Sequence, residues 1–208
     1  GERVFELLDE QEEIPDKGNT YPSKPIRGDI EFESVYFSYK PNEQVIRDLS
    51  FTVNAGESVA IVGYTGAGKT TIANLLTRLW DIDSGSIKID GIDIRKYPLK
   101  TLRRMVQPVQ QDVFLFSDTI YENIGLGEKR SEQEIIQAAE MVQADRFIRQ
   151  DEAAYKKILN EGASNISTGQ RQLLSFARVI AHDPCIIILD EATANIDTET
   201  EQLIQKAM

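Results

Sequence analysis

The stretch that decides the fold reads Gly63-Tyr64-Thr65-Gly66-Ala67-Gly68-Lys69-Thr70. It matches the full pattern of a phosphate-binding loop. The glycines let the backbone curl so that successive N–H groups point at one phosphate, and a following helix adds its positive N-terminal end. Lys69 would reach the β- and γ-phosphates of a nucleotide, and the Thr70 hydroxyl would coordinate Mg²⁺. The alternative is a glycine-rich turn that caps a helix by chance.

The sequence on both sides of this loop favours a phosphate site. Val59–Val62 is a continuous apolar run, which is typical of a central strand covered on both faces. A helix is predicted from Lys69 to Trp80, because apolar residues recur on one face. The residues of this stretch expected to contact the nucleotide are Gly63, Tyr64, Thr65, Gly66, Ala67, Gly68, Lys69, Thr70 and Thr71.

A second apolar run, Ile186–Leu189, ends in the acidic pair Asp190 and Glu191. An acid at the carboxyl end of a central parallel strand lies where ligands bind in open α/β sheets. Asp190 suits the Mg²⁺ shell, because Mg²⁺ prefers carboxylates and retained water. Glu191 would then orient or deprotonate an attacking water as a general base. The alternative is that Glu191 only begins a solvated turn.

The composition excludes several classes of protein. The 208 residues carry 23 Lys+Arg and 34 Asp+Glu, a net charge of -11, which disfavours coating of DNA or RNA. No apolar run approaches the roughly 18 residues of a membrane span, and no secretory signal opens the chain. A single cysteine, Cys185, excludes an internal disulfide framework, and its place at the start of an apolar strand predicts a small buried residue.

The apolar period changes along the chain. Residues 1–27 begin with a helical pattern and become acidic and proline-rich, so they are predicted to be a linker from a preceding domain. Alternation of apolar residues predicts an antiparallel β subdomain over about 28–58 and 84–96. It also predicts a bulge near Ser34 and a hairpin turn at Asp90-Gly91.

The region of about 112–178 is predicted to be a mostly helical insertion. Ser131 and Glu134 form a capping-box pattern ahead of one of its helices, and Thr198 and Glu201 repeat the pattern near the end of the chain. The predicted fold class is therefore α/β, with a phosphate-loop core that carries an antiparallel β subdomain and a helical insertion.

A third motif precedes the acidic pair and reads Asn165-Ile166-Ser167-Thr168-Gly169-Gln170-Arg171-Gln172. With the loop and the acidic pair in the same order, it resembles the signature of ATP-binding cassette (ABC) proteins. The resemblance runs from about Ile30 to the end, and is strongest to the nucleotide-binding domains of exporter-type transporters such as multidrug exporters. It implies a P-loop NTPase fold over 28–208, ATP and Mg²⁺ as ligands, and ATP hydrolysis. It also implies a transmembrane domain on the same polypeptide and a place at the cytoplasmic face of the cell membrane.

The resemblance assigns roles to further residues. Tyr39 matches the aromatic residue that stacks on adenine, whereas alternation alone predicts a strand residue packed in the β subdomain. Gln111 matches the glutamine that touches Mg²⁺ or the water beside the transmembrane partner. From the sequence alone Gln110 or Gln107 would serve as well. Glu161 matches the acid of an exporter-specific loop.

The resemblance further implies that two such domains pair head to tail, with each ATP between one phosphate loop and the other domain's signature. The signature residues expected at the nucleotide are Ser167, Gly169 and Gln170, and Asp197 matches a residue that contacts the opposite subunit. Ser167 is predicted to cap a helix whose N-terminal amides can bind a γ-phosphate. Read without the family, this segment is a capped amphipathic helix.

The sequence departs from the family in three places. Thr168 stands where the family has glycine, and Ala194-Asn195-Ile196-Asp197 differs from the usual Ser-Ala-Leu-Asp. Threonine adds a branched side chain and loses the backbone freedom of glycine. We therefore hypothesise that this signature faces a low-activity site and that the chain is half of a heterodimer. The chain stops at Met208, before the family's switch histidine, so slow hydrolysis is expected of it. The sole histidine, His182, is predicted to end a helix.

Two other functions stay open. One is a soluble ABC-type ATPase that acts on nucleic acid or ribosomes, which the acidic charge disfavours. The other is a nucleotide-binding module without turnover.

Overall fold

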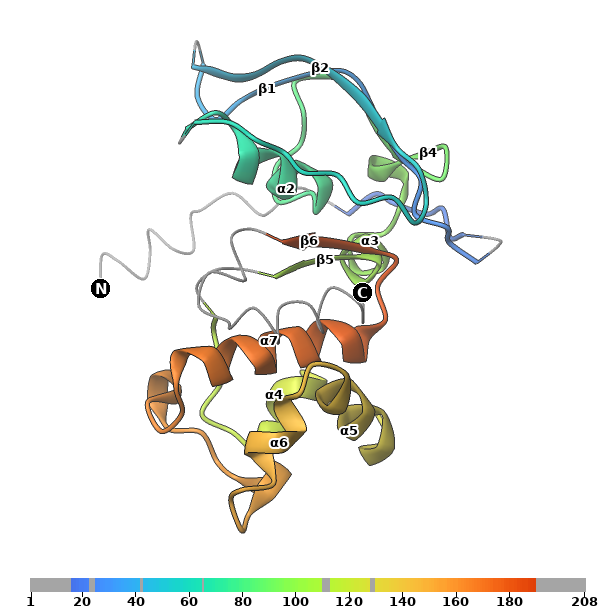
Figure 1. The fold of residues 1–208 in the computed structure, drawn as a ribbon. Helices are drawn as coiled ribbons and strands as arrows, with labels where there is room; N and C mark the ends of the chain where they lie inside the picture. Colours follow the sequence, from blue (N-terminus) through green and yellow to red (C-terminus); the bar gives the residue numbers. More distant parts are fainter. Residues whose placement is uncertain are drawn as a thin grey trace, which may run out of the picture. The chain divides into compact units, whose positions relative to one another are not determined.

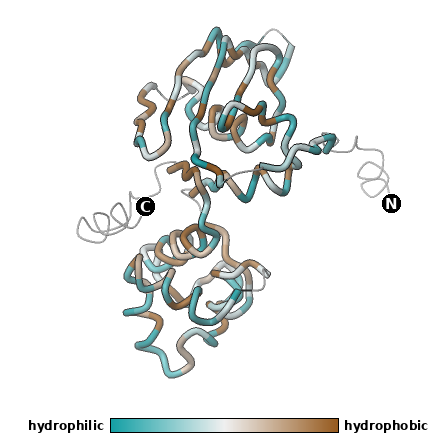
Figure 2. The backbone as a smooth tube through the Cα atoms, turned by 90° about the vertical axis from the view of Figure 1, so that its right-hand side faces the viewer, coloured by the Kyte–Doolittle hydropathy of each residue, from teal (hydrophilic) through white to brown (hydrophobic). Residues whose placement is uncertain are grey.

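The computed structural model describes residues 16–22, 25–41, 43–64, 66–109, 113–127 and 130–189. The chain divides into two compact units, unit 1 (Gly1–Arg103) and unit 2 (Arg104–Met208), each with its own sheet and helices (Figure 1). Figure 2 shows hydrophobic and hydrophilic residues interleaved along both units, as elements with one buried and one solvated face require. The described ranges contain no helix with the length and apolar character needed to cross a membrane.

The described part of unit 1 is built on an antiparallel sheet with the strand order β2-β1-β3-β4. The strands are β1 (Ile30–Ser38), β2 (Gln44–Val53), β3 (Ser84–Ile89) and β4 (Ile92–Asp93). The predicted antiparallel sheet is confirmed. The predicted bulge is also present, because the register slips between Phe32 and Val35, where Ser34 has a φ of 41°. Asp90 and Gly91 form the predicted hairpin turn with φ values of 50° and 77°.

One face of this sheet forms the core of unit 1. Phe32 and Phe37 of β1 and Ile87 and Ile89 of β3 are buried. The ring of Phe32 stacks on that of Phe51 in β2, with 4.5 Å between the centroids. Burial of each such side chain stabilises the fold by about 1.5–3 kcal/mol. The buried side chains therefore stabilise the sheet to which the loops at its ends are attached.

The helix after the phosphate loop, α2 (Lys69–Leu76), is shorter than predicted. The expectation that it runs to Trp80 is wrong, because Arg78 adopts a left-handed φ of 49°. The Arg78 N–H donates to the Leu75 carbonyl at 3.1 Å, and Arg78 Nε donates to Asp81 Oδ1 at 2.9 Å. These contacts stabilise the turn that ends the helix. The short 3₁₀ helix η1 (Ile94–Lys96) and the helix α3 (Leu99–Met105) follow β4.

Val59–Val62 forms no strand, contrary to the prediction. Its side chains are exposed, that of Val62 to 92%. An apolar run becomes a buried strand only where a neighbouring strand takes its N–H and C=O groups. Among the described residues no strand pairs with this run.

Part of the predicted linker lies against the segment around η1 in the same unit. Within residues 16–22, the N–H groups of Asn19 and Thr20 donate to the Lys96 carbonyl at 3.0 and 2.9 Å. The described part of the linker is therefore bound to the domain that follows it, over the turn after η1.

Unit 2 combines the predicted helices with a parallel strand pair, of which only the strand over Ile186–Leu189 was predicted. Its strands β5 (Val106–Val109) and β6 (Ile186–Leu189) pair in parallel. Its helices are α4 (Ile120–Gly125), α5 (Glu132–Met141), α6 (Ala144–Ile148) and α7 (Thr168–His182), with the 3₁₀ helices η2 (Ala154–Lys156) and η3 (Glu161–Ala163). In Figure 1, α7 spans unit 2, and it contacts α4, α5 and α6.

Two details of unit 2 differ from the prediction. β6 is not covered on both faces throughout, since Ile186 is buried while Leu189 is exposed. In the described sheet β6 has a neighbour on one side only, so it lies at an edge. Cys185 is exposed rather than buried, and its Sγ lies 3.3 Å from the Met105 carbonyl oxygen.

The capping box at the start of α5 is confirmed. The Glu134 N–H donates to Ser131 Oγ at 3.3 Å, and the Ser131 N–H donates to the Glu134 carboxylate at 2.8 Å. Hydrogen bonds from the Ser131 hydroxyl and amide hold the pKa of the Glu134 carboxyl below its usual value. The similar pattern at Thr198 and Glu201 lies outside the described residues.

Candidate nucleotide-binding site

The phosphate loop is shaped by its glycines. Gly66 and Gly68 have φ values of 83° and 89°, which glycine adopts without strain. A Cβ atom on Gly68 would also lie 2.8 Å from Ile46 Cδ1 in β2, but it is the backbone conformation that requires glycine there. The loop is closed by the Ala67 N–H, which donates to the Tyr64 carbonyl at 3.0 Å. Thr65 lies outside the described residues.

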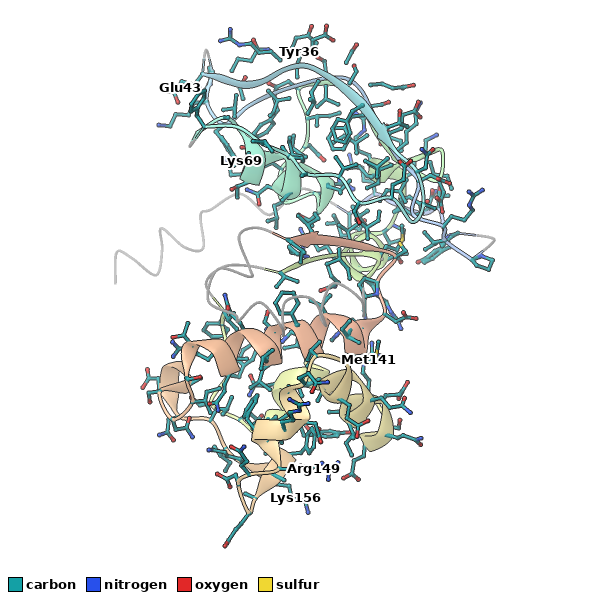
Figure 3. The ribbon with its side chains drawn as sticks, viewed as in Figure 1. Tyr36, Glu43, Lys69, Met141, Arg149 and Lys156 are labelled. Carbon is teal, nitrogen blue, oxygen red and sulfur yellow. The ribbon has the colours of Figure 1, made fainter. Side chains whose placement is uncertain are left out.

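The start of α2 gathers positive charge at this loop. Gly68 is the N-cap of α2 and forms no side-chain cap, so the first turn offers its backbone N–H groups to an anion. Lys69, at the start of α2 in Figure 3, turns back over the loop. Its Nζ donates to the carbonyl oxygens of Gly63 at 2.8 Å and Tyr64 at 3.1 Å. An ammonium group and a helix N-terminus on one glycine loop fit the polyphosphate of a nucleotide.

Tyr39 lies beside the same helix. Its Oη donates to Thr71 Oγ1 at 3.1 Å, and Asn74 Nδ2 donates to Tyr39 Oη at 3.4 Å. Both partners belong to α2, although Tyr39 follows β1. The structure therefore brings the predicted base-stacking residue next to the predicted phosphate-binding helix.

Of the predicted metal ligands, Thr70 is the second residue of α2, whereas the other two and the general base follow the ends of two neighbouring strands. Val109 of β5 pairs with Leu189 of β6, so these parallel strands end side by side. Gln111 follows β5 and the pair Asp190 and Glu191 follows β6 in the sequence. Gln111, Asp190 and Glu191, as well as Gln110 and Asp197, lie outside the described residues. Gln107, the other candidate glutamine, is part of β5.

The signature motif forms the start of α7, as predicted. Ser167 is the N-cap, and its Oγ accepts the Gln170 N–H at 3.2 Å. The Gln170 side chain completes a capping box, because its Oε1 accepts the Ser167 N–H at 3.0 Å. Gly169 lies in the first turn between them. The amides of this turn present a helix N-terminus, the feature needed for a phosphate contact.

Thr168 is the first residue of α7 and has a helical backbone. Threonine adopts that backbone readily, so its branched side chain stands at the helix end without backbone strain. Arg171 Nη2 donates to Thr168 Oγ1 at 2.8 Å, and Arg171 Nη1 donates to the Gly162 carbonyl at 3.5 Å. The latter contact ties the signature to η3, which begins at the exposed Glu161.

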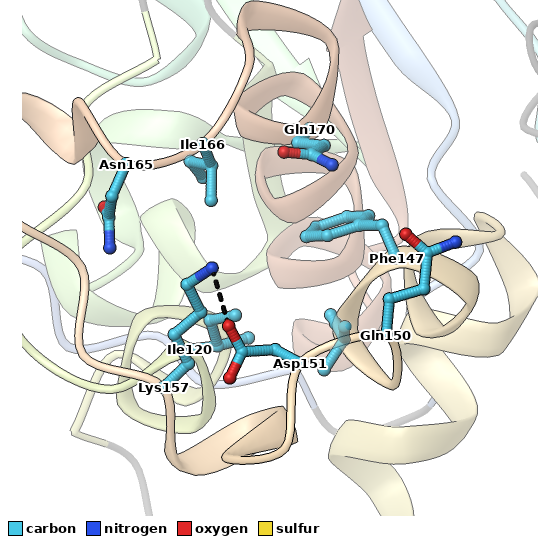
Figure 4. Close-up of a pocket in the computed structure, with 9 residues that line it drawn as sticks. Ile120, Phe147, Gln150, Asp151, Lys157, Asn165, Ile166 and Gln170 are labelled. Carbon is cyan, nitrogen blue, oxygen red and sulfur yellow. Dashed lines mark ion pairs between the residues drawn. The ribbon is translucent and has the colours of Figure 1, made fainter.

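A cavity of about 280 Å³ adjoins the signature within unit 2 (Figure 4). Gln170 and Ile166 line one part of it, and the ion pair between Lys157 Nζ and Asp151 Oδ2, 2.9 Å long, lines another. Hydrogen bonding to Lys157 and to a backbone amide holds the Asp151 pKa below its usual value. The spacing of these two residues gives no sequence signal, because a turn and the 3₁₀ helix η2, rather than an α-helix, join them.

Sequence reasoning also missed Arg178. This half-buried residue of α7 donates from Nε to the Asn123 carbonyl at 2.9 Å and from Nη1 to the Phe114 carbonyl at 3.1 Å. Burial lowers the pKa of its guanidinium group. Asn123 in turn holds Phe116, whose N–H donates to Asn123 Oδ1 at 2.8 Å. The segment after the predicted Gln111 is thus fastened to the signature helix.

His182 is the last residue of α7, as predicted. It is buried, and its Nδ1 lies 2.7 Å from the Arg178 carbonyl oxygen. The imidazole ring of His182 is therefore hydrogen-bonded to the backbone of the last turn of α7.

The fold and the phosphate loop define a P-loop nucleotide-binding domain of α/β class, with an antiparallel sheet and a helical insertion. The ABC transporter family model matches residues 46–194. The chain belongs to the ABC transporter family, whose ATP-binding domains bind ATP with Mg²⁺ and hydrolyse it.

Several relatives match the whole chain or nearly all of it. The ABC transporter ATP-binding protein YknV of Bacillus subtilis is 49% identical over 100% of this chain and 34% of its own length. The fatty acid ABC transporter ATP-binding/permease protein of Mycobacterium bovis is 46% identical over 100% of this chain and 33% of its own length. The ATP-dependent lipid A-core flippase of Haemophilus influenzae is 42% identical over 99% of this chain and 35% of its own length.

The solved structure of a bacterial Atm1-family ABC exporter with ATP bound has a TM-score of 0.89 and 38% identity to this chain. The match covers 100% of this chain and 37% of that one. The chain thus spans about a third of the length of the relatives it matches.

Proposed function

We propose that this chain is the ATP-hydrolysing domain of an exporter that moves a substrate across the cell membrane. The observation that carries the proposal is the Lys69 ammonium group bonded to the Gly63 and Tyr64 carbonyls at the N-terminus of α2. The likeness to an ATP-bound exporter over the whole chain supports the direction of transport. Residues 28–208 would form the ATP-binding domain at the cytoplasmic face, and 1–27 would link it to a transmembrane domain of the same polypeptide.

The roles at the site follow from the chemistry of its residues. Lys69 and the first turn of α2 would bind the β- and γ-phosphates. Thr70, Asp190 and Gln111 would hold Mg²⁺, which neutralises phosphate charge when bound. Glu191 would act as the general base toward the attacking water, a contribution worth about 10²–10⁴-fold in rate.

A contact with the transmembrane domain is supported by an exposed aromatic pair in unit 2. Phe114 and Phe116 are exposed to 67% and 51%, and their rings meet edge to face with 5.0 Å between centroids. Two neighbouring exposed phenylalanines are unusual for a solvated surface and typical of an interaction site. Arg178 and Asn123 hold the backbone of this pair in place.

We also propose that the opposite ATP-binding domain belongs to a different chain. Ser167, Gly169 and Gln170 would face the ATP bound to that partner's phosphate loop. Thr168 adds a branched side chain at this end of α7, where close approach to a phosphate favours glycine. This chain's own phosphate loop would form the more active site with the partner's signature.

The central test uses the full-length protein in lipid nanodiscs. Lys69→Ala should abolish ATP binding, and Glu191→Gln should keep binding while turnover falls at least about 100-fold. Lys100→Ala, an exposed lysine of unit 1, is the matched control and should change neither. ATP binding by Lys69→Ala at the wild-type affinity would overturn the assignment of the site.

The transmembrane contact is tested by placing a photoreactive benzoylphenylalanine at position 114 of the same protein. Illumination should cross-link this position to a membrane-spanning peptide of the same polypeptide, as identified by mass spectrometry. The exposed Tyr21 of unit 1 is the control position and should give no such product. Absence of the cross-link at position 114 would contradict the proposed contact of Phe114 and Phe116 with the transmembrane domain.

A further inference from the structure

Three aromatic rings meet where β1 ends near α2. The Tyr39 ring is perpendicular to the Trp80 ring, with 5.2 Å between centroids and an interplanar angle of 89°. It is also perpendicular to the Phe37 ring, at 4.8 Å and 85°. Edge-to-face pairs at these separations are attractive beyond the area they bury. The Tyr39 ring is therefore held by two other rings.

The hydroxyl of Tyr39 is fixed as well. It donates to Thr71 Oγ1 at 3.1 Å, and Thr71 is buried in α2. Asn74 Nδ2, one turn further along α2, donates to the same hydroxyl at 3.4 Å. With its hydroxyl bonded and two aromatic neighbours packed against it, the ring of Tyr39 has one preferred orientation.

Packing alone does not account for this arrangement. Trp80 is 47% exposed and Tyr39 is 38% exposed, although both are large enough to contribute strongly to a core. Trp80 lies beyond the end of α2, after the left-handed turn at Arg78. That turn brings the indole ring to Tyr39 and leaves part of both rings open to a flat ligand.

We propose that Trp80 is a positioning residue for base recognition, which holds the Tyr39 ring in the orientation that stacks on a purine base. The inference rests on the proposed function, because it assumes that the nucleotide's phosphates bind at Lys69. Trp80 contributes to the affinity for the base and not to the affinity for the phosphates. An edge-to-face pair of this kind corresponds to roughly a 3- to 10-fold difference in affinity.

The test compares two ligands, ATP and inorganic tripolyphosphate, by calorimetry on the full-length protein in EDTA. Trp80→Ala should weaken ATP binding roughly 3- to 10-fold and leave tripolyphosphate binding unchanged. Trp80→Phe, which keeps an aromatic edge, should restore most of the ATP affinity. Leu79→Ala, at the exposed neighbouring position, is the matched control and should change neither ligand. Equal losses for both ligands, or no loss for ATP, would overturn the proposal.

A spectroscopic measurement checks the same point without relying on the alanine variant. Trp80 is the one tryptophan of this sequence. Base stacking on Tyr39 should change the emission of Trp80, so ATP should produce a signal in the wild type that Trp80→Phe lacks. Tripolyphosphate should produce none, and an equal signal from tripolyphosphate would count against the proposal.

Lys69→Ala separates the two possible failures. If Lys69→Ala loses both ligands while Trp80→Ala behaves as the wild type, the nucleotide site stands and the role of Trp80 is refuted. If Lys69→Ala binds both ligands normally, the proposed nucleotide site itself is wrong.

Discussion

Gly18 lies so close to Tyr97 that a Cβ atom built on Gly18 would be 2.0 Å from the Tyr97 carbonyl oxygen. This approach accompanies the hydrogen bonds from Asn19 and Thr20 to the Lys96 carbonyl. It is possible because residue 18 has no side chain. A single glycine therefore allows the predicted linker to bind along unit 1.

Gly18→Ala should release this part of the linker. The added methyl group meets backbone atoms that cannot move aside cheaply, and we expect amide exchange at Asn19 and Thr20 to rise about tenfold or more. Hydrogen-exchange mass spectrometry of the full-length protein measures this. Lys17→Ala, at the exposed neighbouring position, should leave the protection intact. Unchanged protection in Gly18→Ala would show that the close approach is not required.

The two capping boxes of unit 2 allow a matched comparison. Ser131 caps α5 and Ser167 caps α7 with the same pair of bonds. Ser131→Ala and Ser167→Ala should each lower the free energy of unfolding by about 1 kcal/mol, measured with urea. Only Ser167→Ala should also lower ATP turnover of the assembled transporter. An equal loss of turnover in both variants would reduce the role of Ser167 to helix stability.

The capping carboxylate predicts an acid-sensitive contribution to stability. The pKa of Glu134 is lowered in the folded protein, so its contribution is complete above the unfolded value of about 4.3 and is lost as the pH falls through the folded value. The difference in urea midpoint between the wild type and Glu134→Gln should therefore be full at pH 7 and shrink below about pH 4. Glu132→Gln changes a carboxylate of the same turn outside the capping box, and separates the box from the helix dipole. A difference that does not depend on pH would contradict the assignment.

Arg178 should contribute far more to stability than Arg171, which lies two turns earlier on the same helix. Its two bonds to the Asn123 and Phe114 carbonyls come from a half-buried cation, so Arg178→Met should cost about 2 kcal/mol of unfolding free energy. Arg171→Met, which removes more exposed contacts, should cost under about 1 kcal/mol. Urea titration measures the unfolding free energy of both variants. Similar losses for the two would contradict the inference that the Arg178 bonds stabilise unit 2.

The threonine in the signature predicts a gain of activity. If it limits approach to the partner's phosphate, Thr168→Gly should raise ATP turnover of the assembled transporter several-fold. Thr168→Ala removes the branch but keeps a Cβ atom, and should give a smaller gain. An unchanged rate in Thr168→Gly would contradict the degenerate signature and favour a symmetric transporter.

Local patterns predicted much of this fold. The bulge at Ser34, the hairpin at Asp90 and Gly91, and both helix caps depend on residues close together in the sequence, where each residue's own conformational preference decides the structure. The residue pattern of Gly63–Thr70 also predicted the phosphate loop, and the apolar face after it predicted the helix.

Contacts between distant residues could not be predicted in this way. Arg178 bonds to residues 55 and 64 positions away, and Tyr39 bonds to one 32 positions away. The end of α2 depends on the left-handed backbone of Arg78, which the helical pattern of apolar residues does not reveal. The strand predicted over Val59–Val62 is absent for a related reason, because apolar character alone does not specify which strand would pair with it.

The continuity of α7 has a mechanical consequence. Ser167 at its start and Arg178 further along are separated by about 16 Å of unbroken helix. Arg178 Nη1 donates to the Phe114 carbonyl, so the aromatic pair of Phe114 and Phe116 is attached to α7. We therefore expect the signature end of α7 and the aromatic pair to move together whenever the helix moves.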